Sequence, residues 1–190
     1  MALGQVAPQR RLEFTAGRAC AHQVLMQLGW KRLPILCGPH REPLWPAGLV
    51  GSITHCPGYC AAAIATNELY SSLGIDAELN APLPAEVLPI VLSAEEQQVL
   101  VLPSIGIYWD RLLFSIKESV YKLWYPMEHT WLDFEDCHVE VLEDLISFQV
   151  RIHTHEAISA LWRSELRGRF AFDEGHVVTA MTITAPSNEI

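Results

Sequence analysis

One stretch of nine residues decides how this chain folds: Phe114-Ser115-Ile116-Lys117-Glu118-Ser119-Val120-Tyr121-Lys122. It lies within residues 108–124, where apolar residues recur with the spacing of an α-helix. At about 100° per residue these apolar side chains share one face, so we expect that face to pack on the core. We also expect Pro126 to end the helix, because proline disfavours helical geometry in the preceding residue. The apolar stripe consists of Leu112, Ile116, Val120 and Leu123.

A second stripe of this helix is polar and contains Arg111, Ser115, Glu118 and Lys122. The chain has only three lysines, and two of them lie in the nine-residue stretch. Glu118 and Lys122 are four residues apart, which places a carboxylate and an ammonium on one helix face. Such a stripe is consistent with a solvated face or a surface ion pair. It is also consistent with a phosphate site bridged by a metal, because carboxylates bind hard divalent cations and ammonium groups bind phosphates.

A second acidic motif, Gly74-Ile75-Asp76-Ala77-Glu78, lies about forty residues upstream. Alternate residues of a strand point to the same side, so Asp76 and Glu78 should face one way and Ala77 the other. Two adjacent carboxylates repel each other unless a cation or a shared proton lies between them. The pair is either solvated at a strand end or part of a metal site, and oxygen ligands favour magnesium over zinc.

Two further groups of polar residues point to an anionic ligand. The segment Gly51-Ser52-Ile53-Thr54-His55 places two hydroxyls on one strand face and an imidazole at its end, where they could hold a phosphate. A histidine at a strand end is also often purely structural. Several arginines lie in the first quarter of an acidic chain, where they either bind an anion or serve as solubilising charge. They are Arg10, Arg11, Arg18 and Arg41.

The remaining pattern predicts an α+β fold. Residues 15–29 are expected to form a helix capped by Thr15 and ended by Gly29. Residues 49–54, 60–66 and 69–77 are expected to form strands, residues 82–92 a short helix, and Ser93 the capped start of another. From residue 137 onward, three stretches near 137–142, 146–152 and 168–183 alternate between apolar and polar residues, which predicts an antiparallel sheet.

Composition limits the possible functions. The 190 residues suit one domain, and 50% of them are hydrophobic, which is enough for a packed core. The net charge of −9 disfavours nucleic acids and anionic membranes as partners. No apolar run is long enough to span a membrane, and the N-terminus has no apolar signal-peptide core. The five irregularly spaced cysteines suit free thiols in the cytoplasm.

Five segments in order resemble the 4′-phosphopantetheinyl transferases of the larger, pseudo-dimeric type, the Sfp/EntD-like group that includes enterobactin synthetase component D. The resemblance covers about Arg10 to Asp136. The chain begins close to the first motif, so an N-terminal segment usual in this branch is expected to be missing or trimmed. The segments are Ala16-Gly17-Arg18-Ala19-Cys20-Ala21, Arg41-Glu42-Pro43-Leu44-Trp45-Pro46, Gly51-Ser52-Ile53-Thr54-His55, Gly74-Ile75-Asp76-Ala77-Glu78 and the nine-residue stretch 114–122.

The resemblance implies a fold and a reaction. One domain over residues 1–190 would consist of two similar halves, about 1–78 and 79–190, each with an antiparallel sheet packed on a long helix. The enzyme would transfer 4′-phosphopantetheine from coenzyme A (CoA) to a serine of an acyl or peptidyl carrier protein and release 3′,5′-ADP. The carrier could serve siderophore, polyketide, nonribosomal-peptide or fatty-acid synthesis. We expect a monomer. Two alternatives are a catalytically silent CoA- or carrier-binding module and a magnesium-dependent phosphohydrolase.

The resemblance also implies a role for each motif residue. Magnesium would be held by Asp76, Glu78 and Glu118, and Lys122 would neutralise the transferred phosphoryl group. The serine proton would pass to Glu118 or to a water on the metal. Ser52, Thr54 and His55 would contact the CoA phosphates, as would Lys122. Arg18 and Arg11 would bind the 3′-phosphate, and Arg41 and Pro43 would lie near the adenine.

The carrier protein is usually acidic, so an acidic enzyme must recognise it through a local patch. We expect residues 82–92 to provide this patch, with Leu83, Val87 and Leu88 as an apolar platform. The alternative is that these three side chains belong to the core.

Overall fold

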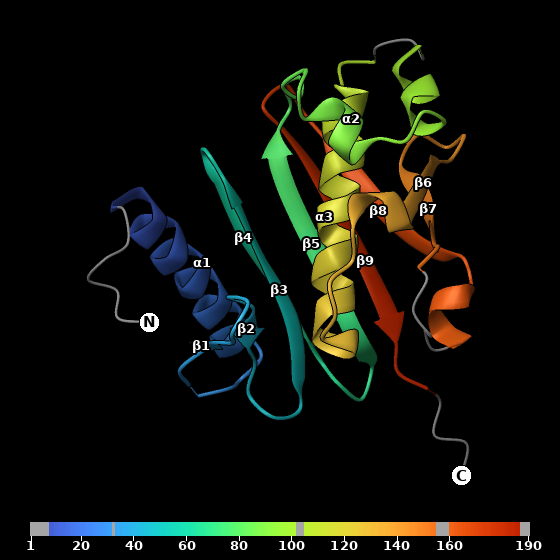
Figure 1. Ribbon diagram of the computed structural model, residues 1–190. Coiled ribbons are helices and arrows are strands. Elements are labelled where there is room, and N and C mark those ends of the chain that lie inside the picture. Colours follow the sequence, from blue (N-terminus) through green and yellow to red (C-terminus); the bar gives the residue numbers. More distant parts are fainter. Residues whose placement is uncertain (1–7, 32, 102–104, 155–159, 187–190) are drawn as a thin grey trace.

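The fold combines two helix-on-strand units, which confirms the α+β prediction (Figure 1). The computed structural model describes residues 8–31, 33–101, 105–154 and 160–186. The helices are α1 (Pro8–Gln27), α2 (Leu88–Val91) and α3 (Trp109–Glu128), with the 3₁₀ turns η2 (Glu96–Val101), η3 (Phe134–Asp136) and η4 (Ala160–Arg163). The strands are β1 (Leu36–Cys37), β2 (Pro43–Leu44), β3 (Leu49–Cys56), β4 (Tyr59–Thr66), β5 (Tyr70–Leu79), β6 (Cys137–Val141), β7 (Ser147–Ile152), β8 (Leu166–Phe172) and β9 (His176–Thr184).

The larger unit is an antiparallel sheet with the strand order β5-β9-β8-β7-β6. Helix α3 lies against this sheet, over β5 and β9 (Figure 1). The predicted apolar stripe is confirmed, because Leu112, Ile116, Val120 and Leu123 are all fully buried in the core of this unit. The alternation at 168–183 is resolved into two strands, β8 and β9, that pair with each other.

The smaller unit is the β3–β4 hairpin covered by α1 (Figure 1). Its own core consists of Ala21, Leu25, Ile35 and Leu49. Strand β5, which we placed in the first half of the chain, is hydrogen-bonded to β9 and therefore belongs to the larger sheet. The division into halves 1–78 and 79–190 stays a prediction.

Two predicted helix boundaries are wrong. Helix α1 begins at Pro8, and the Thr15 hydroxyl donates to the Arg11 carbonyl at 2.8 Å inside the helix, so Thr15 is no N-cap. Proline suits the first helical position, where its missing N–H costs nothing. Helix α3 continues through Pro126 to Glu128. One proline near the end removes a single N–H, and the buried stripe before it holds the helix in place.

A seam joins the two units, and side chains rather than a strand ladder hold it. The Ser52 hydroxyl of β3 accepts a hydrogen bond from the Ile75 N–H of β5 at 3.1 Å. The Thr54 hydroxyl accepts one from the Ala77 N–H at 3.0 Å. On the other side of β5, a Cβ on Gly74 would lie 2.0 Å from the Ser119 carbonyl oxygen, so glycine is what allows α3 to pack this closely. The hydrogen bonds of the seam on one side and the close approach of α3 on the other fix the position of Asp76.

Two expectations from composition can be compared with the structure. All five cysteines are free thiols, as expected. Within the described ranges, no helix is both long and apolar enough to cross a membrane.

Candidate active site

Asp76 lies at the seam and is almost completely buried, with 3% of its surface exposed. Its Oδ1 accepts hydrogen bonds from the Lys122 ammonium at 2.6 Å and from the Thr54 hydroxyl at 3.0 Å. Its Oδ2 is buried and has no hydrogen-bond partner among the described residues. A buried carboxylate oxygen without a partner is costly, so this atom is a candidate ligand for a cation.

Glu78 lies two residues further along β5 and is bound by an arginine. The Arg111 guanidinium donates to Glu78 Oε2 at 3.1 Å. Burial raises the pKa of Glu78, the negative charge of Asp76 raises it further, and Arg111 lowers it. Asp76 and Glu78 alternate with Ala77 along β5, and the Asp76 charge acts on Glu78, as expected for two carboxylates on one side of a strand.

Glu118 faces the same region from α3. Within the described part of the chain, its carboxylate has no hydrogen-bond or ion-pair partner. Burial raises the pKa of Glu118, Lys122 lowers it, and the Asp76 charge raises it again. The pKa of Glu78 is also raised by the charge of Glu118. Strand β5 and helix α3 thus bring three carboxylates and two cations into one electrostatic cluster.

The polar stripe of α3 is therefore not a solvated face. Lys122 and Arg111 each bind an acid of β5, and Ser115 is fully buried with its hydroxyl 3.1 Å from that of Thr179 on β9. Sequence reasoning missed the bond between Arg111 and Glu78. Arg111 is seven residues before Glu118, two helical turns away on the same face, and this spacing was the signal that could have found it.

His55 borders the cluster at the end of β3. Burial lowers its pKa, Glu13 raises it, and Arg10 and Lys122 lower it. Its Nδ1 lies 4.0 Å from Glu13 Oε2 on α1. The neighbouring Cys56 is also close to the acids, because its pKa is raised to about 11 by burial and then by the charges of Glu78 and Asp76. A phosphate bound near His55 would favour the protonated ring and so oppose the effect of burial on its pKa.

The predicted arginines lie apart from the carboxylates. Arg18 of α1 reaches the loop before β1, where its Nε donates to the Ile35 carbonyl at 3.2 Å and its Nη2 lies 3.3 Å from Cys37 Sγ. Arg11 is exposed on α1, and Arg41 is exposed with a positive φ of 72°. Pro43 is half-buried in β2. Within the described residues, no hydrogen bond or ion pair joins these four to the acidic cluster.

The donor set suits magnesium in part. Among the described residues, no three His, Cys, Asp or Glu side chains are grouped closely enough to hold a metal. The reason is visible in the contacts, since Asp76 turns one oxygen to Lys122 and Glu78 turns one to Arg111. Magnesium needs only one or two protein carboxylates, with water and phosphate oxygens completing its shell. The unpartnered Asp76 Oδ2 provides one such oxygen.

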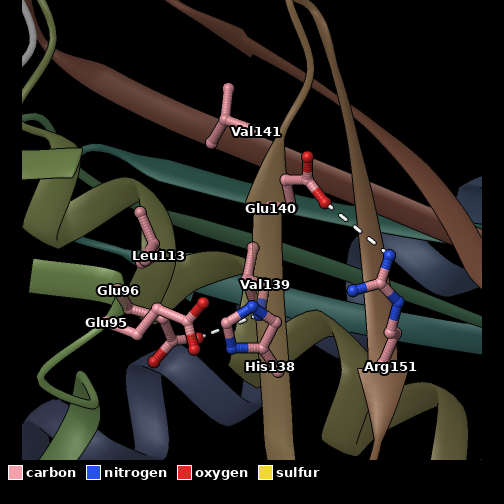
Figure 2. A pocket seen from close by; sticks show the side chains of 8 residues that line it. All are labelled: Glu95, Glu96, Leu113, His138, Val139, Glu140, Val141 and Arg151. Atoms are coloured by element: carbon pink, nitrogen blue, oxygen red, sulfur yellow. Dashed lines mark hydrogen bonds and ion pairs between the residues drawn. The ribbon is translucent and has the colours of Figure 1, made fainter. Parts of the chain in front are cut away.

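A shallow hollow of about 340 Å³ lies elsewhere, between η2 and the β6–β7 hairpin (Figure 2). None of the predicted site residues lines it. Two of its charged side chains, Glu140 and Arg151, form an ion pair with each other, and Glu96 is bound to Lys117. The chemistry suggested by the motifs is at the seam. The lining consists of Glu95, Glu96, Leu113, His138, Val139, Glu140, Val141 and Arg151.

Comparison with known proteins shows the family. The family model "4′-phosphopantetheinyl transferase N-terminal domain" matches residues 1–65, and that of the "4′-phosphopantetheinyl transferase superfamily" matches residues 72–181. The 4′-phosphopantetheinyl transferase Svp of Streptomyces mobaraensis is 41% identical over 189 residues, covering 97% of this chain and 77% of Svp. PptT of Mycobacterium tuberculosis is 39% identical over 181 residues, covering 92% of this chain and 80% of PptT.

The enterobactin branch is similar over a shorter stretch. Enterobactin synthase component D of Salmonella typhi is 36% identical over 117 residues, which cover 60% of this chain and 48% of that protein. Similarity to Svp and PptT covers 97% and 92% of this chain, and the superfamily model extends to residue 181 in β9, beyond the segments that carried the resemblance in the sequence. The chain therefore belongs to the 4′-phosphopantetheinyl transferase superfamily and is a 4′-phosphopantetheinyl transferase.

Proposed function

We propose that the seam between β3, β5 and α3 transfers phosphopantetheine from CoA to a serine of an acyl or peptidyl carrier protein, in a magnesium-dependent reaction that releases 3′,5′-ADP. The observation that carries this proposal is Asp76, whose Oδ1 binds Lys122 while its buried Oδ2 has no partner in the part of the chain that the structure describes. A carboxylate oxygen beside an ammonium suits a reaction in which both a cation and a phosphate must be bound.

The charges of the cluster support a metal. Three carboxylates (Asp76, Glu78 and Glu118) outnumber two cations (Arg111 and Lys122) by one, so the cluster alone would repel a pyrophosphate. One divalent ion reverses the sign of this excess charge. Bound magnesium supplies electrostatic stabilisation of the pyrophosphate oxygens. We assign Asp76 Oδ2 and the free oxygens of Glu78 and Glu118 as its protein ligands.

Lys122 binds the transferred phosphoryl group in this proposal. Its ammonium has three N–H donors; one is used by Asp76 at 2.6 Å, and the Thr54 hydroxyl lies at 3.4 Å. The side chain is 26% exposed, so a remaining donor can reach a ligand. An ammonium held in place by a buried carboxylate stabilises developing charge without having to reorganise, an effect worth about 10²–10³ in rate.

Glu118 takes the proton of the carrier serine. Burial raises the pKa of this carboxyl, and a raised pKa makes a stronger base near neutral pH. A carboxylate bound tightly to a metal is a poor base, so Glu118 can serve as base only while its bond to the ion is loose. The electron pair of the serine oxygen then forms the new P–O bond as the bond to the 3′,5′-ADP oxygen breaks.

CoA binds along β3 and α1. His55, Thr54 and Ser52 are assigned to the CoA phosphates, although the Ser52 and Thr54 hydroxyls also hold the seam. Arg18 and Arg11 are assigned to the 3′-phosphate, and Arg41 and Pro43 to the adenine. Arg18 stacks over Phe14 with its Cζ 4.5 Å from the ring centre, which keeps the guanidinium in place without neutralising it.

The carrier docks on residues 82–92, but the platform needs revision. Leu83 is 7% exposed and belongs to the core of the larger unit, so our assignment of it to a surface platform is wrong. Ile90 is 67% exposed in α2 and takes its place. The monomeric state and the cytoplasmic location stay predictions of the sequence.

Incubation of the protein with CoA, Mg²⁺ and an apo-carrier tests the proposal by mass spectrometry. We expect the carrier to gain one phosphopantetheine group and this gain to require Mg²⁺. Cleavage of CoA without carrier modification would indicate a phosphohydrolase. Binding of CoA without either reaction would indicate a silent module. Both of these outcomes would overturn the proposal.

Two variants separate binding from chemistry. Glu118→Gln should bind CoA and transfer poorly, and near-normal transfer would remove Glu118 from the reaction. Arg18→Ala should weaken CoA binding and leave the turnover of bound CoA close to that of the wild type. Unchanged CoA affinity in Arg18→Ala would remove this residue from the phosphate site.

A further inference from the structure

The chain between β5 and α3 forms a long connecting segment, which we call the excursion. Side chains link the residues where the excursion leaves β5 to those where it enters α3, and we call these linked ends its base. Asn80 Nδ2 donates to the Gly106 carbonyl at 2.7 Å, and Asn80 Oδ1 accepts from the Tyr108 N–H at 3.0 Å. The Asp110 carboxylate accepts from the Leu83 N–H at 2.8 Å. The excursion, residues 80–108, includes α2, on which we place the carrier.

Arg111 makes the remaining contacts at this base. Its Nε donates to the Ala81 carbonyl at 3.0 Å, and its Nη2 donates to the Pro82 carbonyl at 3.1 Å. Its Nη1 donates to Glu78 Oε2 at 3.1 Å. One planar group therefore holds the first turn of the excursion and a carboxylate of the acidic cluster. The guanidinium is rigid, so a shift of either partner moves the hydrogen bonds of the other.

We propose that Arg111 is a positioning residue that orients the Glu78 carboxylate toward the metal and couples it to the base of the carrier-docking excursion. The inference rests on the proposed function of the seam and of residues 82–92. With Oε2 bound to Arg111, the other Glu78 oxygen is left for a ligand. Binding of a carrier to the excursion and binding of Mg²⁺ to the acids then favour each other, because both require the same placement of this guanidinium.

The alternative is that Arg111 only stabilises the fold. Two substitutions distinguish these roles, since they remove different bonds. Arg111→Gln removes the positive charge beside Glu78 and the set of guanidinium hydrogen bonds to Glu78, Ala81 and Pro82. Arg111→Lys keeps a positive charge for Glu78 but cannot reach two carbonyls and a carboxylate at fixed angles. Asn80→Ala is the matched control, because it opens the other side of the base without touching Glu78.

The experiment measures two affinities by calorimetry. Mg²⁺ is titrated into the protein–CoA complex, and an apo-carrier with its accepting serine replaced by alanine is titrated with CoA and Mg²⁺ present. For Arg111→Gln we expect Mg²⁺ affinity to fall about tenfold or more, as for other groups that orient metal ligands. Carrier affinity should fall about fivefold or more. Arg111→Lys and Asn80→Ala should lose carrier affinity and keep Mg²⁺ affinity.

The results separate this inference from the proposed function. CoA affinity without Mg²⁺ should be unchanged in the two variants that keep the charge of the cluster, Arg111→Lys and Asn80→Ala. Equal loss of Mg²⁺, carrier and CoA affinity in Arg111→Lys would assign Arg111 a purely structural role. A folded Arg111→Gln with wild-type Mg²⁺ affinity would overturn the inference. If Arg111→Gln does not fold, Arg111→Lys decides alone, and unchanged carrier affinity overturns it. A wild-type protein that transfers no phosphopantetheine would instead overturn the proposed function.

Discussion

Two lysines of α3, five residues apart, bind acids in opposite ways. Lys117 and Glu96 are each 1% exposed, and every N–H of the ammonium is used: by Glu96 at 2.7 Å, by the Val91 carbonyl at 2.8 Å and by the Phe134 carbonyl at 2.9 Å. Lys122 is 26% exposed, and its partner Asp76 has an oxygen without a hydrogen bond from any described residue. The Lys117 ion pair joins three segments of the fold, whereas the Lys122 ion pair leaves part of its ammonium exposed and one carboxylate oxygen without a partner among those residues.

Glu96 completes the contrast. Besides Lys117, its carboxylate accepts hydrogen bonds from the N–H groups of Ser93 and Val139, both at 2.9 Å. A buried ion pair with all its hydrogen bonds made has nothing left to bind and holds α2, α3 and β6 together. Our expectation that Lys122 rather than Lys117 touches phosphate agrees with this geometry, and it stays a prediction.

Lys117→Met should produce the largest loss of stability. It leaves the Glu96 carboxylate buried without a cation, and breaking such a pair costs about 3–5 kcal/mol. Chemical denaturation should show this loss. The double variant Lys117→Met/Glu96→Leu removes both charges and should recover much of it. A single variant as stable as the wild type would break the comparison, because Lys117 would then not be a structural lysine.

Lys122→Met should reduce the rate of transfer strongly and stability only moderately, in contrast to Lys117→Met. We expect transfer to fall by about two to three powers of ten, because a preorganised cation at the phosphate is lost. The loss of stability should be smaller than for Lys117→Met, since the Lys122 side chain is 26% exposed and that of Lys117 only 1%. Mass-spectrometric rates and denaturation midpoints measure the two quantities. Near-normal transfer would exclude Lys122 from the reaction.

Thr54 tests the seam with a smaller change. Thr54→Val keeps the shape of the side chain but leaves the Ala77 N–H without its acceptor and Asp76 with Lys122 as its one remaining donor among the described residues. An unmade buried hydrogen bond costs about 1–3 kcal/mol, and transfer should fall as well. Thr54→Ser keeps the hydroxyl and should retain most of both. Equal losses in the two variants would mean that the methyl group, rather than the hydroxyl, matters at the seam.

The sequence predicted those features that depend on local periodicity. The two stripes of α3 and the shared face of Asp76 and Glu78 follow from the repeats of helix and strand, and both are present. The cage around Lys117 could not be predicted, because its acceptors are the carbonyls of Val91 and Phe134, whose positions depend on tertiary packing. Our predicted end of α3 was wrong for the same reason, because the packing of the buried apolar stripe outweighed the local effect of Pro126.

The roles of the seam hydroxyls show the same limit. Alternation placed Ser52 and Thr54 on one face of β3, which is correct, but strand geometry alone does not say what they face. The structure shows them accepting from the backbone of β5. This bridging by side chains requires two strands that lie side by side without a ladder, an arrangement that no pattern within either strand indicates.

His55 should give the smallest effect, and it is one of pH. Burial lowers its pKa in the folded protein, so the unfolded chain binds the proton more tightly. Stability is then fully present above the unfolded pKa of about 6.5 and decreases as pH falls from there to the folded pKa. His55→Gln should remove this part of the pH dependence. The contribution should be below about 1 kcal/mol, because the side chain is 30% exposed and solvent screens it.

Bound CoA should shift the pKa of His55 in the direction opposite to the shift caused by burial. A bound phosphate favours the charged imidazole, so CoA raises the pKa of His55 and its binding takes up protons near neutral pH. Calorimetry in buffers of different ionisation enthalpy measures this uptake. We expect the proton uptake to be smaller in His55→Gln. It should be unchanged in Lys117→Met/Glu96→Leu, which alters only the buried ion pair of Lys117 and Glu96. Equal proton uptake in His55→Gln and the wild type would place the ring away from the phosphates and assign His55 to the structure of the seam.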